Sequence, residues 1–320
     1  MKRSLLAGLC LLAALTTATA QEWPTKPVRI IAPFAPASTP DTLARVLAQK
    51  LQTRLKQPFV VDNKPGAGGM LGTDAVAKAA PDGYTLGLSV VGPLVNNTQL
   101  YKKMPYAPER DLAPITVAVT QPSLLVVRSD SPAHNLAELM AELKKNPGKF
   151  NYSSIGNGSL SHLTMALIAL KSGTDIIHVP YAGSSQAMLA VMSGDVQMAI
   201  LPALSVLPQV NAGKLRVIAA STARRSSLLP DVPTLKEQGL ADVDAGAWIG
   251  VVAPAAVPKP LQQRIYQEIA AVLKDPEVVQ TLRGQMMEVV ASPPEDFAAF
   301  MQEERERWTP VIVKNKITLD

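Results

Sequence analysis

Short apolar runs alternate with segments of helical periodicity along the first part of the chain. Residues 28–32 (VRIIA), 59–61 (FVV) and 84–91 (YTLGLSVV) are apolar runs of the kind that form buried strands. Between them, residues 40–55 carry leucine and valine mostly at intervals of three or four, and residues 73–79 form a shorter helical segment. The order strand–helix–strand–helix–strand predicts a parallel sheet with crossover helices.

The same alternation restarts after Pro122. Residues 124–127 and 150–154 read as strands, and residues 135–145 as a helix with Asn135 as its N-cap. We expect further strands at 176–179, 198–201 and 217–220, and further helices at 160–170, 186–192 and from residue 261 onward.

The second series ends at a polar stretch, residues 222–227, followed by two prolines. We therefore predict an α/β protein with two lobes, in which the second lobe is inserted into the first. Lobe 1 is expected to comprise residues 21–122 and 223–320, and lobe 2 residues 123–222, so the chain crosses between the lobes twice. A chain of 320 residues is long enough for two such cores.

The N-terminal twenty residues have the layout of a secretory signal peptide. Lys2 and Arg3 form a positive region, residues 5–15 are apolar, and small residues at 18–20 form a cleavage pattern. The apolar run is too short for a membrane span, which needs about 20 residues. A buried N-terminal helix is the alternative interpretation. We expect residues 1–20 to be removed and the mature chain to lie in the periplasm.

Composition excludes several classes of protein. Loss of Lys2 and Arg3 lowers the formal charge from +5 to +3, and aromatic residues make up only 4% of the chain. Because no basic run is interleaved with aromatic residues, we expect no nucleic-acid partner. Cys10 is the only cysteine and lies in the signal segment, which removes disulfides, thiol nucleophiles and cysteine-ligated metals from the mature chain.

The remaining candidates for cofactor chemistry are weak. The histidines, His134, His162 and His178, do not have the spacing of metal ligands. The glycine-rich segment 66–72 departs from the G-x-G-x-x-G pattern of a dinucleotide-binding loop. We expect no metal, no cofactor, no catalytic activity and a monomer.

Three expected strand-to-helix loops are built largely from Gly, Ser, Thr and Ala. They cover residues 33–41, 153–159 and 180–185, and none contains Lys or Arg. Open α/β sheets bind ligands at the carboxyl ends of their strands, and the N–H groups and dipole of a helix start favour an anion there. These loops predict a site for a small carboxylate, although each cap alone could serve only its own helix. The candidate residues here are Phe34, Ala37, Ser38, Thr39, Ser154, Gly156, Asn157, Ser159, Tyr181, Ala182, Gly183 and Ser184.

Asp41 has two interpretations. An acid in the first turn of a helix commonly complements the helix dipole. Alternatively, its carboxylate accepts a hydrogen bond from the ligand or from a bound water, and we retain it as a candidate site residue.

Several segments of the chain resemble the Bug (TctC-like) family of periplasmic solute-binding proteins, which serve tripartite tricarboxylate transporters. The resemblance spans the mature chain and implies a two-lobed Venus-flytrap fold that closes around a small carboxylate. It also implies membrane transporter subunits, or a sensor kinase, as partners. The matching segments are WPTKPVR at 23–29, PFAP at 33–36, NKPGAGG at 63–69, PDGYTL at 81–86, VPY at 179–181, AGKLR at 212–216, LPDVPT at 229–234 and WIG at 248–250.

The chain departs from the family pattern at three places, all in the apolar direction. Ala37-Ser38 replaces the usual Gly-Gly, and the loop 90–94, which includes Val91, is apolar where the family is Ser/Thr-rich. Leu201 stands where the family often has an acidic or polar residue. These changes predict a ligand with an aromatic or otherwise apolar body, partly covered by Phe34 and Tyr181, unless the side chains only pack the lobe cores.

A secreted α/β hydrolase is the alternative function. Ser159 or Ser184 would be its nucleophile, but no G-x-S-x-G motif is present and no third member of a triad is evident.

Overall fold

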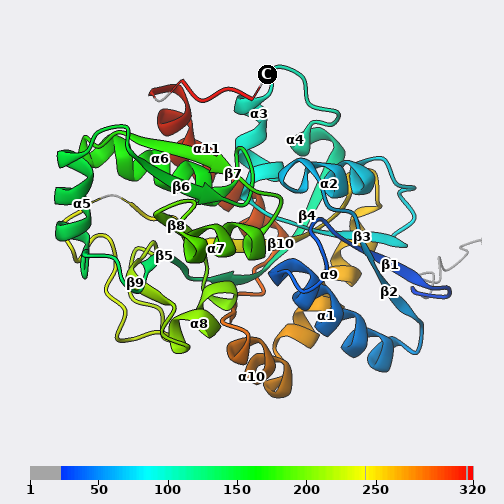
Figure 1. Cartoon of the computed structure of the whole chain (residues 1–320). Coiled ribbons are helices and arrows are strands. Elements are labelled where there is room, and N and C mark those ends of the chain that lie inside the picture. Colours follow the sequence, from blue (N-terminus) through cyan, green and yellow to red (C-terminus); the bar gives the residue numbers. More distant parts are fainter. Residues whose placement is uncertain (1–22, 242, 315, 320) are drawn as a thin grey trace, which may run out of the picture.

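The computed structural model describes residues 23–241, 243–314 and 316–319, so the expected signal peptide lies outside the described residues. Two β-sheets divide the chain into two lobes that lie side by side (Figure 1). Lobe 1 contains a six-stranded sheet of order β11-β4-β10-β3-β1-β2, and lobe 2 a five-stranded sheet of order β7-β6-β8-β5-β9. The predicted α/β fold with two lobes is confirmed.

Lobe 1 combines parallel and antiparallel strands. Strand β1 pairs in parallel with β2 and β3, as the alternating pattern predicts, whereas β10 runs antiparallel to β3 and β4. The sequence analysis did not identify β4 and β10; Pro114 interrupts the first and Gly250 the second. The strands are β1 Val28–Ala32, β2 Phe59–Asn63, β3 Thr85–Ser89, β4 Leu112–Gln121, β10 Ala247–Pro254 and β11 Glu288–Val289. The helices are α1 Thr39–Leu55, α2 Met70–Ala77, α3 Asn97–Leu100, α4 Pro108–Asp111, α9 Lys259–Leu273, α10 Pro276–Gly284 and α11 Pro294–Lys314.

Lobe 2 follows the expected alternation closely. Its central strand β8 pairs in parallel with β6 and antiparallel with β5. The strands are β5 Ser123–Arg128, β6 Phe150–Ser154, β7 Ile176–Pro180, β8 Met198–Pro202 and β9 Leu215–Ala220. The helices are α5 Leu136–Lys145, α6 Leu160–Ser172, α7 Ser184–Ser193 and α8 Ala203–Asn211.

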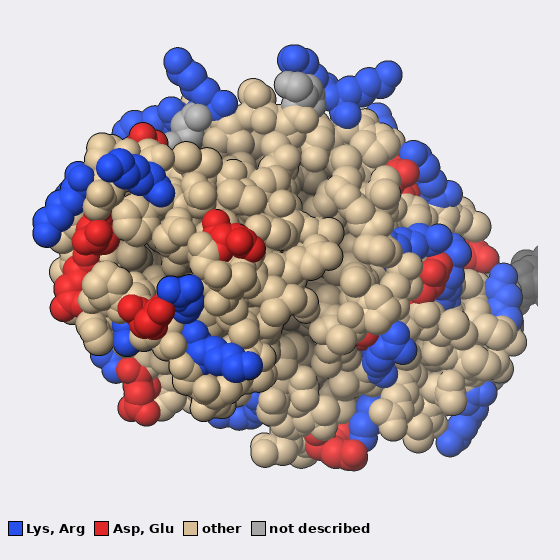
Figure 2. Space-filling view, viewed as in Figure 1, with Lys and Arg blue, Asp and Glu red and all other residues tan. Residues whose placement is uncertain are grey.

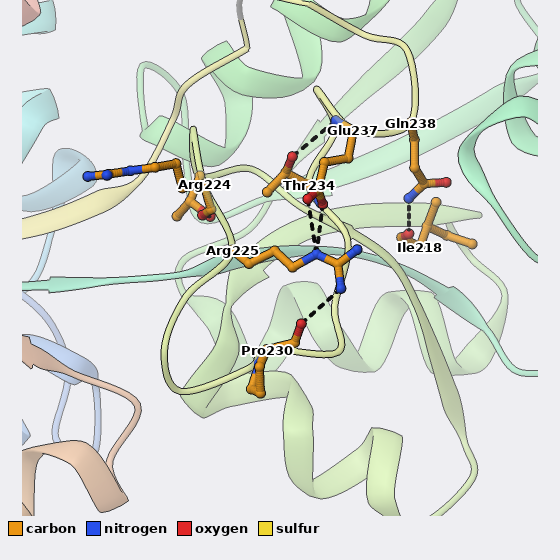
Figure 3. Close-up of polar contacts among 8 residues, drawn as sticks. Ile218, Arg224, Arg225, Pro230, Thr234, Glu237 and Gln238 are labelled. Carbon is orange, nitrogen blue, oxygen red and sulfur yellow. Dashed lines mark hydrogen bonds and ion pairs between the residues drawn. The ribbon is translucent and has the colours of Figure 1, made fainter.

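The segment after β9 packs on lobe 2, which differs from the boundary expected at residue 223. Thr234 forms a parallel bridge with Ala220, and Gln238 donates to the carbonyl of Ile218 at 2.6 Å. Figure 3 shows the Arg225–Glu237 ion pair that closes this segment on itself. Hydrogen bonds to the edge strand β9 therefore hold the segment, and the chain returns to lobe 1 only at β10.

Helix α11 joins the two lobes on the side away from the candidate site. It packs against β4 of lobe 1 and against α6 of lobe 2. Its Phe297 and Trp308 are fully buried in a hydrophobic cluster that includes residues of both lobes. The interlobe crossings β4–β5 and β9–β10 are thus supported from one side by a helix, which fixes the floor of the space between the lobes. No helix among the described residues is long and apolar enough to cross a membrane.

Candidate functional site

A cavity of about 290 Å³ lies between the lobes. Figure 2 shows a hollow where the lobes meet, with Lys, Arg, Asp and Glu side chains mostly farther out on this face. Lobe 1 contributes the loop after β1, the start of the segment after β3, and Gly68; lobe 2 contributes the loops before α6, α7 and α8. The crossing strands contribute the floor, which consists of Gln121, Ser123, Ala247 and Trp248.

Among the described residues, those that line the cavity include no charged side chain and no histidine. The polar lining consists of hydroxyl groups, two glutamines and backbone amides. An anion bound here is therefore held by dipoles rather than by a counter-ion, as at other helix N-termini.

Four helix starts converge on the cavity, one more than the sequence predicted. Ser38 caps α1, accepting from the N–H of Asp41, and Ser159 caps α6, accepting from the N–H of His162, each at 3.4 Å. Helix α7 begins after Gly183, which provides no side-chain cap. Helix α8, preceded by Pro202, is the additional start, and it also has no side-chain cap. Uncapped helix starts leave backbone N–H groups that need a partner.

Asp41 lies behind the loop 34–38 rather than in the cavity wall. Its carboxylate is 2% exposed and accepts from the backbone N–H of Ala37, from Asn63 Nδ2 and from Arg45 Nε, each at 2.9 Å. Burial raises the pKa of Asp41, but the hydrogen bonds outweigh it and lower the pKa below its usual value. Asp41 thus fixes Ala37, whose φ of 62° is unfavourable for a residue with a Cβ.

Buried polar side chains also support the loop that precedes α6 in lobe 2. The hydroxyl of Ser154 lies 2.6 Å from His178 Nε2, and the N–H of Gly158 donates to His162 Nδ1 at 3.1 Å. The two imidazoles are stacked with centroids 3.8 Å apart. Burial lowers the pKa of His162 to about 4; burial and the neighbouring His162 lower that of His178 to about 3. Both rings are therefore neutral at pH 7 and fix the loop that precedes α6.

The structure brings most of the predicted site residues to the cavity. Nine of them line it: Phe34, Ala37, Ser38, Thr39, Val91, Ser159, Ala182, Gly183 and Ser184. Three more, Gly156, Asn157 and Tyr181, line an adjoining pocket that shares Phe34 and Ala182 with the cavity. Asp41 and Ser154 lie behind the loops that they support.

Leu201 does not face the ligand cavity. It is fully buried in the core of lobe 2, beneath α7 and α8. Its neighbours Ile200 and Pro202 line the cavity instead. The cause is the alternation of side chains along β8, which directs successive residues to opposite faces of the sheet.

Seven polar or aromatic residues that line the cavity were not among the predicted site residues: Gln121, Ser123, Ser161, Ser185, Gln186, Ser205 and Trp248. Gln121 and Ser123 lie on either side of Pro122, the break at which lobe 2 was expected to begin. A search for polar residues at this break would have found them. Trp248 lies in a motif that carried the family resemblance, but the sequence did not show that it faces the cavity.

Trp248 is held in place by a buried acid from α11. Its indole N–H donates to Glu304 Oε2 at 3.0 Å, and the indole N–H of Trp308 donates to the same oxygen at 3.3 Å. Arg307 forms an ion pair with Glu304 at 3.0 Å and with Asp244 at 3.2 Å. Burial raises the pKa of Glu304, although the indole N–H groups and Arg307 oppose the shift.

The geometry does not support a serine nucleophile. The hydroxyl of Ser159 donates to the carbonyl of Gly156 at 2.6 Å and serves as a helix cap. Within the described residues, neither Ser159 nor Ser184 forms a hydrogen bond to an imidazole ring through its hydroxyl, and the serine that does, Ser154, does not line the cavity. No group of three or more potential metal ligands occurs in the described part of the chain.

Comparison with known proteins identifies the family. The profile of the tripartite tricarboxylate transporter family receptor, TctC, matches residues 43–317. The chain belongs to the TctC family. BugT of Bordetella pertussis (strain Tohama I) is 35% identical over 295 residues, which cover 92% of this chain and 90% of BugT. The Bug/TctC resemblance is therefore confirmed.

Two solved structures of similar proteins contain carboxylates. An adipate-bound protein of R. palustris is 31% identical, with a TM-score of 0.88 over 92% of this chain and 99% of that one. MatC from Rhodopseudomonas palustris with bound malate is 30% identical, with a TM-score of 0.84 over 91% of this chain and 100% of MatC. The solved structure of the periplasmic binding protein BugD is 31% identical, with a TM-score of 0.84 over 92% of this chain and 99% of that one. This TctC protein is accordingly a solute-binding protein and not an enzyme.

Proposed function

We propose that this TctC protein captures a small carboxylate with an apolar body in the cavity between its lobes. The single observation that carries this proposal is a cavity without charged side chains onto which four helix starts converge. The adipate and malate bound by its structural neighbours support the carboxylate class.

The helix starts would supply the binding energy for the carboxylate. Each contributes about 0.3–1 kcal/mol at an exposed site and up to about 2 kcal/mol when partly buried. The first N–H of α8, that of Ala203, donates to the carbonyl of Pro122. The N–H groups at the start of α7, and those of α8 beyond Ala203, are the donors that a carboxylate satisfies best. Because no ion pair contributes, the affinity for the carboxylate stays moderate, which favours release as well as capture.

The remaining lining favours an apolar ligand body. Phe34 and Val91 from lobe 1 and Ile155 and Ile200 from lobe 2 present hydrocarbon to the cavity, and Trp248 closes its floor. An aromatic or branched acid that contacts these groups removes their apolar surface from water. This stabilises the complex by about 25 cal/mol for each Å² of apolar surface buried. A ligand rich in hydroxyl and carboxylate groups, such as citrate, gains less here.

The proposed setting is the periplasm. Residues 1–20 would direct export and then be removed, leaving a monomeric mature chain. After closure, the two lobes together would present a surface to the membrane subunits of a tripartite tricarboxylate-type transporter, or to a sensor kinase. The family to which the chain belongs supports the transporter assignment.

Isothermal titration of the mature chain tests the proposal directly. The acids are benzoate, a branched aliphatic acid, adipate and citrate, each compared with its uncharged amide. We expect binding of the acids and at least a tenfold weaker binding of the amides. Equal binding of acid and amide would exclude a carboxylate site, and a clear preference for citrate would exclude an apolar ligand body.

Two variants of Ser184 separate backbone from hydroxyl donors. Ser184 is the first residue of α7, where proline is tolerated because its φ suits the position. The Ser184→Ala variant loses only the hydroxyl, whereas Ser184→Pro also loses the backbone N–H. We expect Ser184→Pro to bind the acid about tenfold more weakly than Ser184→Ala, which corresponds to about 1.4 kcal/mol.

A further inference from the structure

The amide side chain of Gln121 lies in the cavity floor without a protein partner. Gln121 is the last residue of β4 and pairs with Ala247 of β10, so it sits where the chain crosses between the lobes. It is 6% exposed and lines the cavity. Within the described residues, its amide makes no hydrogen bond, and its Oε1 is completely buried. A buried amide in this state is costly unless something else pairs with it.

The chemistry of an amide limits what that partner can be. The group offers both a donor and an acceptor, and a rotation of about 180° exchanges their positions without changing the shape. A hydroxyl or a primary amide on the ligand can donate and accept, so it matches the side chain in either orientation. A carboxylate only accepts, and it leaves the glutamine oxygen unpaired.

The charged side chains behind the cavity floor also favour a neutral polar group over a second carboxylate. Trp248 lies beside Gln121 in the floor, and its indole N–H is bonded to the buried Glu304. The cluster behind the indole holds two acids, Glu304 and Asp244, and one base, Arg307. A second anionic group at the floor would meet no cation in the cavity wall and an acidic cluster behind it, whereas a neutral polar group avoids both penalties.

We propose that Gln121 determines specificity at the cavity floor, and that the preferred ligand is a monocarboxylate whose far end carries a hydroxyl or a primary amide instead of a second carboxylate. This inference rests on the proposed function, because the helix starts hold the single carboxylate. The apolar walls then contact the middle of the ligand, and Gln121 forms hydrogen bonds with the polar group at its far end.

Two matched series of ligands test the inference by titration calorimetry. The aliphatic series consists of hexanoate, the monoamide of adipate, and adipate. The aromatic series consists of benzoate, 4-carbamoylbenzoate and terephthalate. In at least one series we expect the amide-bearing monoacid to bind about tenfold or more tightly than both its dicarboxylate and its unsubstituted analogue, since a site built for a polar group rejects ligands that lack it.

The variant Gln121→Met removes the amide at nearly constant length. We expect the ratio of the affinities for the amide-bearing acid and the unsubstituted acid to fall to about one in this variant. This holds irrespective of any change in overall affinity. The matched control is Gln99→Met: Gln99 also has a buried amide nitrogen without a partner among the described residues, but it does not line the cavity. This control should keep the wild-type preference, so a general effect of removing a buried amide is separated from ligand recognition.

The outcomes distinguish the inference from the proposed function. If the acids bind but the dicarboxylate is preferred in both series, or if Gln121→Met keeps the preference for the amide, the role of Gln121 is refuted and the carboxylate site stands. If hexanamide and benzamide bind as tightly as hexanoate and benzoate, or if no acid binds, the carboxylate site fails and the inference fails with it.

Discussion

The stacked pair His162 and His178 predicts a loss of stability between pH 6.5 and pH 5. Both imidazoles lie behind the loop that precedes α6, with Tyr152 stacked on His178 at 5.0 Å between centroids. The pKa values of about 4 and about 3 lie below the usual 6.5 because burial disfavours the charged rings. Protonation of His162 would also remove the acceptor of the Gly158 N–H group.

The sign and size of the effect follow from proton linkage. A group with a lowered pKa in the folded state takes up its proton in the unfolded state first, so the free energy of unfolding falls as the pH falls through 6.5. Near pH 5 the unfolded chain carries about two more protons on these rings, which gives a slope of about 2.6 kcal/mol per pH unit. Over the interval from pH 6.5 to pH 5 the pair therefore removes about 3 kcal/mol.

The assay is denaturant unfolding of the mature chain at constant ionic strength from pH 7.5 to pH 5. This window avoids most carboxylates with lowered pKa values, which act below about pH 4.5. Glu304, whose pKa is raised, changes stability in the opposite direction, but its contribution is common to all variants. The decisive quantity is the slope with pH, because a substitution that merely weakens packing shifts the whole curve.

His162→Phe keeps an aromatic ring in the stack and removes one titrating group. The slope should fall by about half, to about 1.3 kcal/mol per pH unit. The control is His134→Gln, at an exposed histidine outside the stack, which should leave the slope unchanged. A wild-type curve that is flat between pH 6.5 and pH 5, or a His162→Phe variant with the full slope, would refute the reasoning.

Three further predictions concern packing around the site. Asp41→Ala should cost about 1–3 kcal/mol of stability in denaturant unfolding and weaken acid binding, because the N–H of Ala37 and the amide of Asn63 lose their common acceptor; unchanged binding would contradict its role behind the loop. Leu201→Ala and Ile200→Ala should each cost about 2–5 kcal/mol of stability, because both side chains are fully buried. Only Ile200→Ala should also change ligand affinity directly, since Ile200 lines the cavity and Leu201 does not, as titration of both variants would show. Gly250→Ala should destabilise by about 1–3 kcal/mol because its Cβ would lie 2.2 Å from Phe297 Cζ, and Phe297→Leu in the same chain should recover part of that loss in thermal unfolding.

Much of the fold could be predicted from local pattern alone. Strands such as β1 and helices such as α1 bury one face or both, so their hydrophobic periodicity is visible in the sequence. The N-cap Asn135 was predicted for the same reason, since capping is a local interaction between residues two or three positions apart. The family resemblance likewise rested on short local motifs, two of which, PFAP at 33–36 and VPY at 179–181, overlap the strand-to-helix loops.

Other features depended on contacts between distant segments. The antiparallel strands β4 and β10 pair within the sheet of lobe 1, although 125 residues lie between the end of β4 and the start of β10. The sequence of neither strand indicates which strand it pairs with. The lobe boundary after β9 depended on hydrogen bonds from the Leu235 N–H and the Gln238 side chain to that strand. Such pairings depend on contacts formed by the whole chain, so they cannot be predicted from any single short segment of the sequence.

At the site, the sequence by itself determined the chemistry and the tertiary structure decided the geometry. Strand-to-helix loops without Lys or Arg predicted an anion site based on helix dipoles, because residue type and capping are local properties. The sequence could not say that Asp41 faces away from the ligand, that Ile200 rather than Leu201 lines the cavity, or that Gln121 and Trp248 form its floor. Those placements follow from sheet register and from the packing of α11 across both lobes, and only the folded chain brings these elements together.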